Sequence, residues 1–470
     1  MSRFDDLRAK HPRFTYEDYA VDRRDDALTF TFSFTMAPDV HFAPTTILHA
    51  PDEGRLASLP REVIDGLAFH LGMIELLSYW KTACAPEIVI KAGALDAAQV
   101  AWWRDLILHG MREFFFVNRI DFTRDDLFAL VTSPRAGRPA ARFDAPLSGD
   151  EDLLLVSGGK DSAFSLEFLR ESGHCVRALF LNPAPAARDV ARVAGITRSV
   201  VVSRTLDPAM LALNREGYLN GHTPFSAYLA FLGAACSVVY GHRNVIVSNE
   251  RSCDEPAAHY LGADVIHQYS KTYRFEARVT EYVRRHLAKE AHFWSLLRPL
   301  YELQVVKLFS AFPRQFPVFR SCNRGSKENA WCGQCAKCLS IFTALYPFVS
   351  RDEILGIFGG DLFERAELVP LARALAGLTE TRPLECVGAI DETLAAFHLS
   401  LTKFLTDHGG QMTRVSALPP VLAWFAEEMA PRHPDLAATA ARILGDWSDR
   451  HGLPLAYAEA LRARLPRQRD

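Results

Sequence analysis

The sequence predicts an α/β protein with a doubly wound parallel sheet at its core, preceded by an α+β region and followed by a helical region. From residue 151 onward, short apolar runs alternate with helical patterns, which is typical of parallel strands joined by right-handed helical crossovers. Before residue 133, one run alternates strictly between apolar and polar residues, as a half-buried strand does. After residue 349, Leu394, Phe397 and Leu401 recur at helical spacing. The predicted boundaries are an N-terminal region over 1–132, a linker over 133–149, a central domain over 150–349 and a helical region over 350–470.

The composition limits the class of protein and its partners. The chain has 470 residues, of which 49% are hydrophobic and 23% charged, enough for two or three domains with large cores. A formal charge of −3 gives no bulk attraction for nucleic acids or membrane surfaces, so we expect neither as a partner. The charged first residues carry no apolar run, so we expect no secretory signal. Nine cysteines, an odd and mostly scattered set, favour a reducing cytoplasm over a disulfide framework.

The N-terminal region mixes strands and helices. Residues 28–36 alternate as a strand, 64–80 follow helical spacing, 87–91 form a short strand and 96–116 an aromatic-rich helix. The 133–149 stretch contains three prolines and two glycines, which predicts a linker.

The central domain carries the alternating pattern. Strands are predicted over 153–157, 176–181, 198–203 and 243–248, with helices over 161–172, 185–194 and 224–239. The uncharged stretch 223–241 is about as long as a membrane span, but its polar residues and its α/β surroundings predict a buried helix. Amphipathic helices are expected over 273–289 and 302–311.

The turn after the first central strand reads Ser157-Gly158-Gly159-Lys160-Asp161-Ser162. Glycines let the backbone approach an anion closely, and the following helix N-terminus adds positive potential. Lys160 adds a cation, so the expected ligand is a phosphate or pyrophosphate. A Walker A loop is excluded, because position 154 is leucine and Asp161 follows the lysine directly.

Other predicted strand ends also carry polar residues. Asn182 follows the second strand, and residues 248–255 follow the fourth. The loop over 217–226 should project to the same side. Ligands of doubly wound sheets bind beyond these carboxyl ends, so we expect a site there.

Four cysteines with the spacing Cys-x9-Cys-x2-Cys-x2-Cys form a second strong motif: Cys322, Cys332, Cys335 and Cys338. Four thiolates suit tetrahedral zinc, and a site filled by four protein ligands is structural. An iron–sulfur cluster and unmetallated thiols are the alternatives. Of the other five cysteines, Cys253 lies in a polar loop, and the rest are expected to be mostly apolar and inert.

The glycine turn resembles the Ser-Gly-Gly-x-Asp-Ser loop of the PP-loop ATP pyrophosphatases, which implies the PP-loop (adenine nucleotide α-hydrolase-like) fold. These enzymes cleave ATP between its α- and β-phosphates and pass AMP to a substrate oxygen. Together with the cysteine spacing, residues 150–345 resemble the zinc-containing PP-loop ligases that make 7-cyano-7-deazaguanine.

Over its whole length the chain resembles the MurL family, the ATP-dependent UDP-N-acetylmuramoyl-L-alanyl-L-glutamate epimerases. The resemblance rests on residues 69–75, 157–162, 220–226, 248–252, 267–271 and 332–338. It implies inversion of the terminal L-Glu of that UDP-muramoyl dipeptide to D-Glu for peptidoglycan synthesis, with Mg²⁺ as a cofactor. ATP would be consumed to form an acyl adenylate and pyrophosphate, and hydrolysis of the acyl adenylate would release AMP.

The chemistry of such a reaction suggests roles for particular residues. ATP would be held by Ser157, Gly158, Gly159, Lys160, Asp161, Ser162 and Asn182, with Asp161 as the Mg²⁺ ligand. Glu250 is our first candidate for the proton-transfer group, because it comes two residues after a predicted strand end. The other candidates are Asp254, Cys253, His222 and Lys271. Arg251, Arg320 and Arg324 are candidate counter-charges for the anionic substrate.

Two alternative functions stay open at this point. The cysteine motif also fits a PP-loop nucleobase-modifying ligase or tRNA thiolase, although the nearly neutral charge counts against tRNA. A non-catalytic nucleotide-binding protein on the same fold is the other. The sequence leaves the oligomeric state and the number of catalytic bases undecided.

Overall fold

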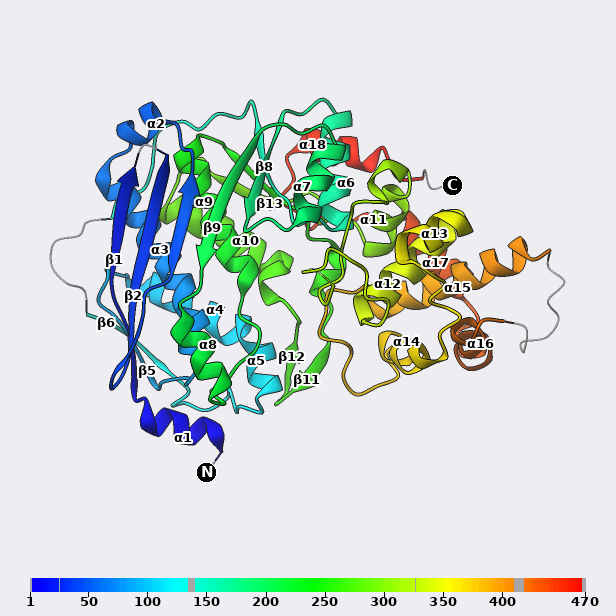
Figure 1. Ribbon diagram of the computed structural model, residues 1–470, viewed down its shortest axis with the longest axis horizontal. Helices are drawn as coiled ribbons and strands as arrows, with labels where there is room; N and C mark the ends of the chain where they lie inside the picture. The colour runs from blue at the N-terminus through cyan, green and yellow to red at the C-terminus, as the bar shows by residue number, and fades with distance from the viewer. Residues whose placement is uncertain (1, 25, 134–139, 326, 410–417, 467–470) are drawn as a thin grey trace.

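One mixed sheet of eleven strands organises the first 300 residues. The computed structural model describes residues 2–24, 26–133, 140–325, 327–409 and 418–466. The strand order is β13-β10-β7-β8-β9-β4-β2-β1-β5-β6, with β3 paired to β2. In Figure 1 the first strands of the chain lie at the left, and most helices after residue 336 gather at the right, while the last helix, in red, lies at the top centre. The predicted α/β class is confirmed.

The parallel half of the sheet contains five strands: β7 (Asp152–Leu155), β8 (Val176–Leu181), β9 (Ser199–Thr205), β10 (Asn244–Val247) and β13 (His292–Ser295). Side chains alternate along a strand, so Leu153 packs into one apolar core and its neighbour Leu154 into the other. Helices α9 (Phe225–Tyr240) and α10 (Tyr273–His286) cover the first face, and α6 (Lys160–Glu171) and α7 (Pro185–Val193) cover the second. The four predicted strands and their crossover helices are confirmed.

The chain reverses its direction across the sheet between β7 and β10. From β7 it proceeds through β8 to β9 on one side, and it later returns to place β10 and β13 on the other. The loops that follow the carboxyl ends of β7 and β10 therefore lead toward opposite edges of the sheet. Such a switch point is where open α/β sheets bind ligands.

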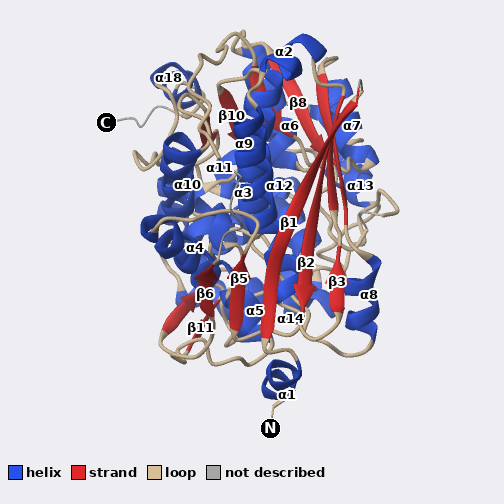
Figure 2. Ribbon diagram, turned by 90° about the vertical axis from the view of Figure 1, so that its left-hand side faces the viewer, coloured by secondary structure: helices blue, strands red, loops and turns tan. Residues whose placement is uncertain are grey.

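The other half of the sheet comes from the N-terminal region. It contains β1 (Arg13–Arg24), β2 (Ala27–Met36), β3 (Val40–Phe42), β4 (Thr45–His49), β5 (Glu87–Ile90) and β6 (Ala129–Thr132). Helix α3 (Arg61–Trp80) packs against β1 and α9 (Figure 2). The remaining helices of this region are α1 (Arg3–Lys10), α2 (Glu53–Ser58), α4 (Ala97–Gly110) and α5 (Arg112–Val117). The predicted strands over 28–36 and 87–91 and the helix ending at Trp80 are confirmed.

Antiparallel pairing of β4 with β9 joins the two halves into one sheet. The predicted linker separates them in sequence only. Residues 134–139 of that stretch lie outside the described residues, and Phe143 and Ser148 make isolated bridges to Ala288 and His242. The domain boundaries stay a prediction.

Several local predictions were wrong. The aromatic-rich helix expected over 96–116 is two helices, α4 and α5, with a break at Met111 after the poor helix former Gly110. Strand β1 was missed because a bulge between Tyr16 and Asp18 interrupts its alternation. Strand β13 was missed because four residues are too few to show a period.

The C-terminal region is mainly helical in the residues that the structure describes. Its helices are α11 (Glu302–Phe309), α12 (Ala336–Leu345), α13 (Arg351–Phe358), α14 (Val369–Leu375), α15 (Ile390–Asp407), α16 (Pro420–Trp424), α17 (Leu436–Gly445) and α18 (Leu455–Arg462). The expectation of helix throughout 350–470 is wrong for residues 376–389 and 446–454, which run without regular structure. Gly377, at φ 78°, ends α14, and we call residues 376–389 the return segment.

The helix expected over 223–241 is α9, and fourteen of its sixteen residues are buried. Its apolar faces contact β10, α3 and α10. Among the helices that the structure describes, none is long and apolar enough to cross a membrane.

Candidate active site

The loop over residues 157–162 turns tightly from β7 into α6. Gly158 has φ 89°, and a Cβ there would lie 2.6 Å from the backbone nitrogen of Ala187, so only glycine fits. The Ser162 hydroxyl accepts from the Gly158 N–H at 3.2 Å and donates to the Gly159 carbonyl at 3.1 Å. The N-cap residue is Gly159, which has no side chain to neutralise the positive end of the helix dipole. We call this loop the phosphate loop, because its geometry suits an anion.

A cavity of about 220 Å³ opens at the switch point between β7 and β10, and we call it the switch-point cavity. Apolar side chains such as Leu181 and Phe225 form part of its wall. Its polar lining comes from the phosphate loop, the β10 loop and three more distant positions: Ser157, Asp161, Ser162, Ser248, Asn249, Glu250, Lys271, Lys337 and Cys386. A smaller side cavity of about 30 Å³ shares Glu250, Lys271 and Cys386 and adds Cys253 and His267.

Lys160 is buried at the base of the phosphate loop between two carboxylates. Its Nζ lies 2.5 Å from Asp161 Oδ1 and 3.0 Å from Glu302 Oε1. Burial alone would lower the pKa of Lys160, but the charges of Asp161, Glu302 and Glu250 outweigh it and raise that pKa well above its usual value. The lysine is therefore a fixed cation beside the phosphate loop.

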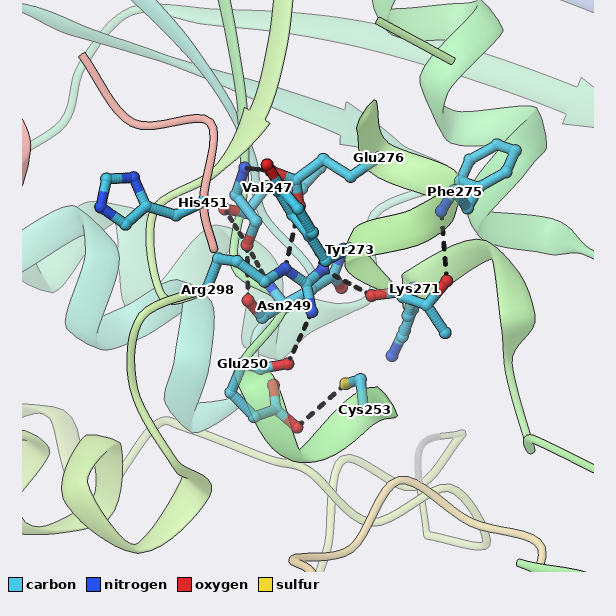
Figure 3. A network of polar contacts seen from close by, with 12 residues as sticks. Val247, Asn249, Glu250, Cys253, Lys271, Tyr273, Phe275, Glu276, Arg298 and His451 are labelled. Carbon is cyan, nitrogen blue, oxygen red and sulfur yellow. Dashed lines mark hydrogen bonds and ion pairs between the residues drawn. The ribbon is translucent and has the colours of Figure 1, made fainter. Parts of the chain in front are cut away.

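A buried arginine fixes the backbone that carries Glu250 and Lys271. Arg298 is 1% exposed and donates to the Glu250 carbonyl at 2.9 Å and to the Lys271 carbonyl at 2.5 Å. Glu276 accepts from its Nε at 3.0 Å. Figure 3 shows the guanidinium between these segments, with the Glu250 and Cys253 side chains directed to the same side. This network positions two of the predicted catalytic residues on the cavity wall.

The charged side chains around Glu250 and Lys271 neutralise one another. Burial by itself would raise the pKa of Glu250, but Lys160, Lys271 and Lys337 lower it below its usual range. Burial would lower the pKa of Lys271, yet nearby Cys386, Cys253 and Glu250 raise it. Both groups therefore stay charged at neutral pH.

Three other predicted residues have structural partners. Asp254 accepts from the Tyr273 N–H at 3.0 Å and lies 3.6 Å from Arg298. Asn182 adopts φ 44°, and its side-chain amide bonds both backbone groups of Arg204, at 2.7 and 2.9 Å. The His222 ring lies 5.3 Å from the His267 ring, between centroids, and burial lowers its pKa.

The three predicted arginines do not come together. Arg251 stacks on Tyr301 and bonds Asp446 at 2.8 Å. Arg320 donates to the Asn329 and Phe319 carbonyls at 3.0 and 2.7 Å. Arg324 is exposed. Neither of the two cavities is lined by these side chains.

The four motif cysteines gather at the N-terminus of α12. Their Sγ atoms all lie within 4.8 Å of one another, with distances of 3.9 Å for Cys322–Cys335, 3.7 Å for Cys332–Cys338 and 3.5 Å for Cys335–Cys338. A zinc ion with four thiolates at 2.3 Å requires Sγ–Sγ distances of about 3.8 Å. The cluster therefore fits a tetrahedral zinc ion.

The cysteine cluster adjoins the active site. Just before it, Ser321 Oγ accepts from the Lys160 N–H at 3.2 Å, and the Arg320 N–H donates to the Gly158 carbonyl at 2.8 Å. Within it, Lys337 points to the switch-point cavity and its Nζ donates to the Cys386 carbonyl. The cluster thus supports the phosphate loop and delivers a cation to the cavity.

Sequence reasoning missed Lys337, Glu302 and Cys386. Lys337 stood inside the cysteine motif, so its position was a usable signal. Cys386 was expected to be apolar and inert, but it lines both cavities and its Sγ lies 3.1 Å from Lys271 Nζ. No local pattern indicated it, since the return segment brings it to the site from the C-terminal region.

Comparisons with known proteins agree over most of the chain. Residues 6–296 match the family model described as the MurL N-terminal domain, and 318–413 match the MurL C-terminal domain. Relatives from Xanthomonas oryzae pv. oryzae and Salinispora tropica are each 31% identical, over 84% and 82% of this chain and 87% and 84% of their own lengths. Both are named UDP-N-acetyl-alpha-D-muramoyl-L-alanyl-L-glutamate epimerase. A Micromonospora relative with the same name is 31% identical over 82% of this chain and 86% of its own length. No solved structure matches the chain significantly.

Proposed function

The chain belongs to the MurL family, and on this premise we propose that it inverts the terminal L-glutamate of UDP-N-acetylmuramoyl-L-alanyl-L-glutamate to D-glutamate for peptidoglycan synthesis. Both family matches contribute to the switch-point cavity: the phosphate loop lies in the first, and Lys337 and Cys386 lie in the second. None of the nine cysteines forms a disulfide, which supports a reducing compartment, and we place the reaction in the cytoplasm.

The chemistry explains why such an epimerase would consume ATP. An α-proton beside a free carboxylate is very weakly acidic, because its removal adds negative charge to an anion. Transfer of AMP to the carboxylate gives an acyl adenylate, whose carbonyl oxygen can accept the charge. We propose this activation as the first step, followed by deprotonation, reprotonation on the opposite face and hydrolysis that releases AMP.

The phosphate loop is our proposed site for the ATP phosphates. Its serines, glycines and Lys160 offer hydroxyl, backbone N–H and ammonium donors at a helix N-terminus. The Asp161 carboxylate lines the cavity next to them, and a carboxylate oxygen is a ligand that Mg²⁺ accepts. A bound magnesium ion would neutralise charge on the leaving pyrophosphate.

The zinc proposal follows from the fit of the four thiolates. Since all four coordination positions would be occupied by cysteines, the ion would be structural. Its role would be to hold the 320–338 segment, and through it the phosphate loop and Lys337.

One observation carries the functional proposal: a single cavity joins the phosphate loop to Glu250, Lys271 and Cys386, which are candidate proton-transfer groups on neighbouring segments. A site for ATP cleavage alone needs only the phosphate loop. An epimerase that works through an activated carboxylate needs both within reach of one substrate.

The direct test is incubation of the protein with UDP-N-acetylmuramoyl-L-alanyl-L-glutamate, ATP and Mg²⁺ in D₂O. We expect D-glutamate at the dipeptide terminus, one deuterium at its Cα, and AMP with pyrophosphate. A reaction without ATP is the control and should leave the substrate unchanged. Formation of ADP, or inversion without deuterium, would overturn the proposal.

A further inference from the structure

Two cysteines from distant parts of the chain line the same cavity. Cys253 lies in the 3-10 helix η1 (Arg251–Asp254) after β10, and Cys386 lies in the return segment between α14 and α15. Both line the side cavity, and Cys386 also lines the switch-point cavity. A substrate group activated at the phosphate loop would therefore meet Cys386 in the switch-point cavity and Cys253 in the side cavity that shares Cys386, Glu250 and Lys271 with it.

The two thiols have opposite kinds of partner. Cys386 Sγ accepts a hydrogen bond from Lys271 Nζ at 3.1 Å and a second from His267, whose Nδ1 lies 2.6 Å from Glu113 Oε2. Cys253 Sγ donates to Glu250 Oε1 at 3.2 Å. One sulfur thus faces two cationic donors, and the other faces a carboxylate.

These partners give the thiols different protonation states. Burial alone would raise the pKa of Cys386, but Lys271, His267 and Lys337 lower it to about 6. At Cys253, burial and the neighbouring Glu250 charge both raise the pKa well above its usual value, and Lys271 offsets this only in part. At neutral pH, Cys386 is a thiolate and Cys253 a thiol.

Glu250 and Lys271 are less suited to move the proton. The low pKa of Glu250 makes it a weak base, and the raised pKa of Lys271 keeps it an ammonium ion. A general base works best with a pKa near the operating pH, a condition that Cys386 meets. This reassigns Glu250, our first candidate from the sequence, to a positioning role beside Cys253.

We propose that Cys386 and Cys253 are the two catalytic residues that invert the α-carbon, an inference that rests on the proposed epimerase function. The Cys386 thiolate takes the α-proton of the activated L-glutamyl group: the C–H bond breaks, an S–H bond forms, and the electron pair enters the enolate. The Cys253 thiol then gives its proton to the opposite face of the enolate, where the pair forms the new C–H bond. The protein is left with a Cys386 thiol and a Cys253 thiolate.

The resting state returns when Cys386 loses its proton to solvent and Cys253 gains one. The surrounding charges favour this return, because Lys271 and His267 stabilise the thiolate at Cys386 and Glu250 disfavours it at Cys253. The titratable and charged groups around the pair are Lys271, His267, Lys337, Glu250, Glu113 and Arg298, together with Glu255, Arg382 and Glu385 of the side-cavity wall.

The first test uses the wild-type protein and isotopes. With L-substrate, ATP and Mg²⁺ in D₂O, early D-product should carry one solvent deuterium, while unreacted L-substrate carries none. Each thiol carries a single exchangeable hydrogen. The α-hydrogen removed by Cys386 therefore stays on Cys386, and the opposite face of the enolate receives the solvent-derived deuterium of Cys253. Transfer of the original α-hydrogen into the D-product would indicate one shared base and would overturn the proposal.

The second test separates the two thiols by substrate configuration. Both C386S and C253S should lose at least about 100-fold in epimerisation rate. C253S should still exchange the α-hydrogen of L-substrate with D₂O, returning L-product, whereas C386S should exchange only the D-substrate. C175S, which changes an exposed cysteine, is the matched control and should keep full activity.

Formation of AMP and pyrophosphate is measured in the same samples. If both cysteine variants form AMP but exchange L- and D-substrate equally, or still epimerise at the wild-type rate, the two-thiol proposal fails. If the wild type itself forms neither AMP nor D-glutamate, the proposed function fails instead. If a cysteine variant does not fold, the deuterium content of the wild-type product and substrate tests the two-thiol proposal on its own.

Discussion

At the residue scale, the titration of two side chains should shape the pH dependence of epimerisation. Cys386 must be deprotonated, so kcat/KM should fall as the pH drops through about 6. His267 must be protonated to support the thiolate, so kcat/KM should also fall as the pH rises through about 9. Initial rates at saturating ATP across pH 5–10 should therefore give a bell-shaped profile.

The matched variant for this profile is His267→Asn. It removes one of the three cations that lower the pKa of Cys386, the others being Lys271 and Lys337, so the acidic limb should move to higher pH and the alkaline limb of His267 should vanish. An acidic limb that stays near pH 6 in the variant would contradict the assigned interaction. AMP formation, followed alongside, shows whether the change lies in activation or in inversion.

The contrast between Cys253 and Cys386 also shows what residue patterns could reveal. Cys253 was a candidate because its neighbours in sequence are polar and follow a strand end. The partners of Cys386, namely Lys271 and His267, are more than 100 positions away. The state of a thiol depends on the charges that the fold brings to it, and no local pattern records those.

At the element scale, the N-terminus of α12 ties the cysteine cluster to the phosphate loop. Cys335→Ser removes one of four thiolates, so we expect loss of about one equivalent of zinc by elemental analysis. Because the 320–338 segment supports Gly158, Lys160 and Lys337, AMP formation should fall at least about tenfold. Cys84→Ser, at a buried cysteine outside the cluster, should keep the metal and is the control. Unchanged zinc content in Cys335→Ser would exclude the site.

Arg382 holds the return segment in place. Loosening this segment should impair inversion of the α-carbon more than activation by ATP. Arg382 Nη1 lies 3.1 Å from Glu255, and its Nη2 donates to the Gly388 carbonyl at 2.5 Å. Arg382→Met removes these bonds close to Cys386 and leaves the phosphate loop untouched. We expect epimerisation to fall about 10- to 100-fold with AMP formation changed much less. An equal loss of both activities would argue against this role for the segment.

Among the elements, those with a clear period were predictable and those shaped by their neighbours were not. Strand β2 alternates over its whole length, and α9 is apolar on all sides, so both were predicted. The bulge in β1 and the brevity of β13 conceal their pattern. The return segment was predicted as helix, although Gly377, Pro383 and Gly388 interrupt it.

At the scale of the whole molecule, the continuous sheet makes the N-terminal region part of the fold of the catalytic core. Strand β4 covers the edge of β9, and α3 packs on α9. A chain beginning at residue 140 would expose both, and each large apolar side chain left exposed costs about 1.5–3 kcal/mol. Exposure of about five such side chains would therefore cost about as much as the typical free energy of unfolding of a whole domain, about 5–15 kcal/mol.

We therefore expect the fragment 140–470 to lack a cooperative thermal transition and a native near-ultraviolet dichroism spectrum. The full-length chain is the reference. A fragment that unfolds cooperatively and still forms AMP would show that the central domain is independent, as its sequence boundary at residue 150 suggests.

The arrangement of the site was predictable only up to the edge of the sheet. Alternating strands and helices place residues 157–162 and 248–255 at one edge, so those contacts followed from the sequence. The approach of Glu302, Lys337 and Cys386 depends on how the C-terminal helices pack, which apolar periodicity does not determine.

The pairing of Lys160 has a consequence for the order in which ligands associate. Its ammonium group is already paired with Asp161 and Glu302, so the positive charge of Lys160 is neutralised before any ligand binds. Incoming phosphates would have to compete for that ammonium, and the exchange would release the Asp161 carboxylate. Nucleotide and divalent cation should then each increase the affinity of the protein for the other, which is positive heterotropic coupling. The phosphate loop would bind ATP only weakly without the divalent cation, so ATP would seldom be cleaved in an incomplete complex.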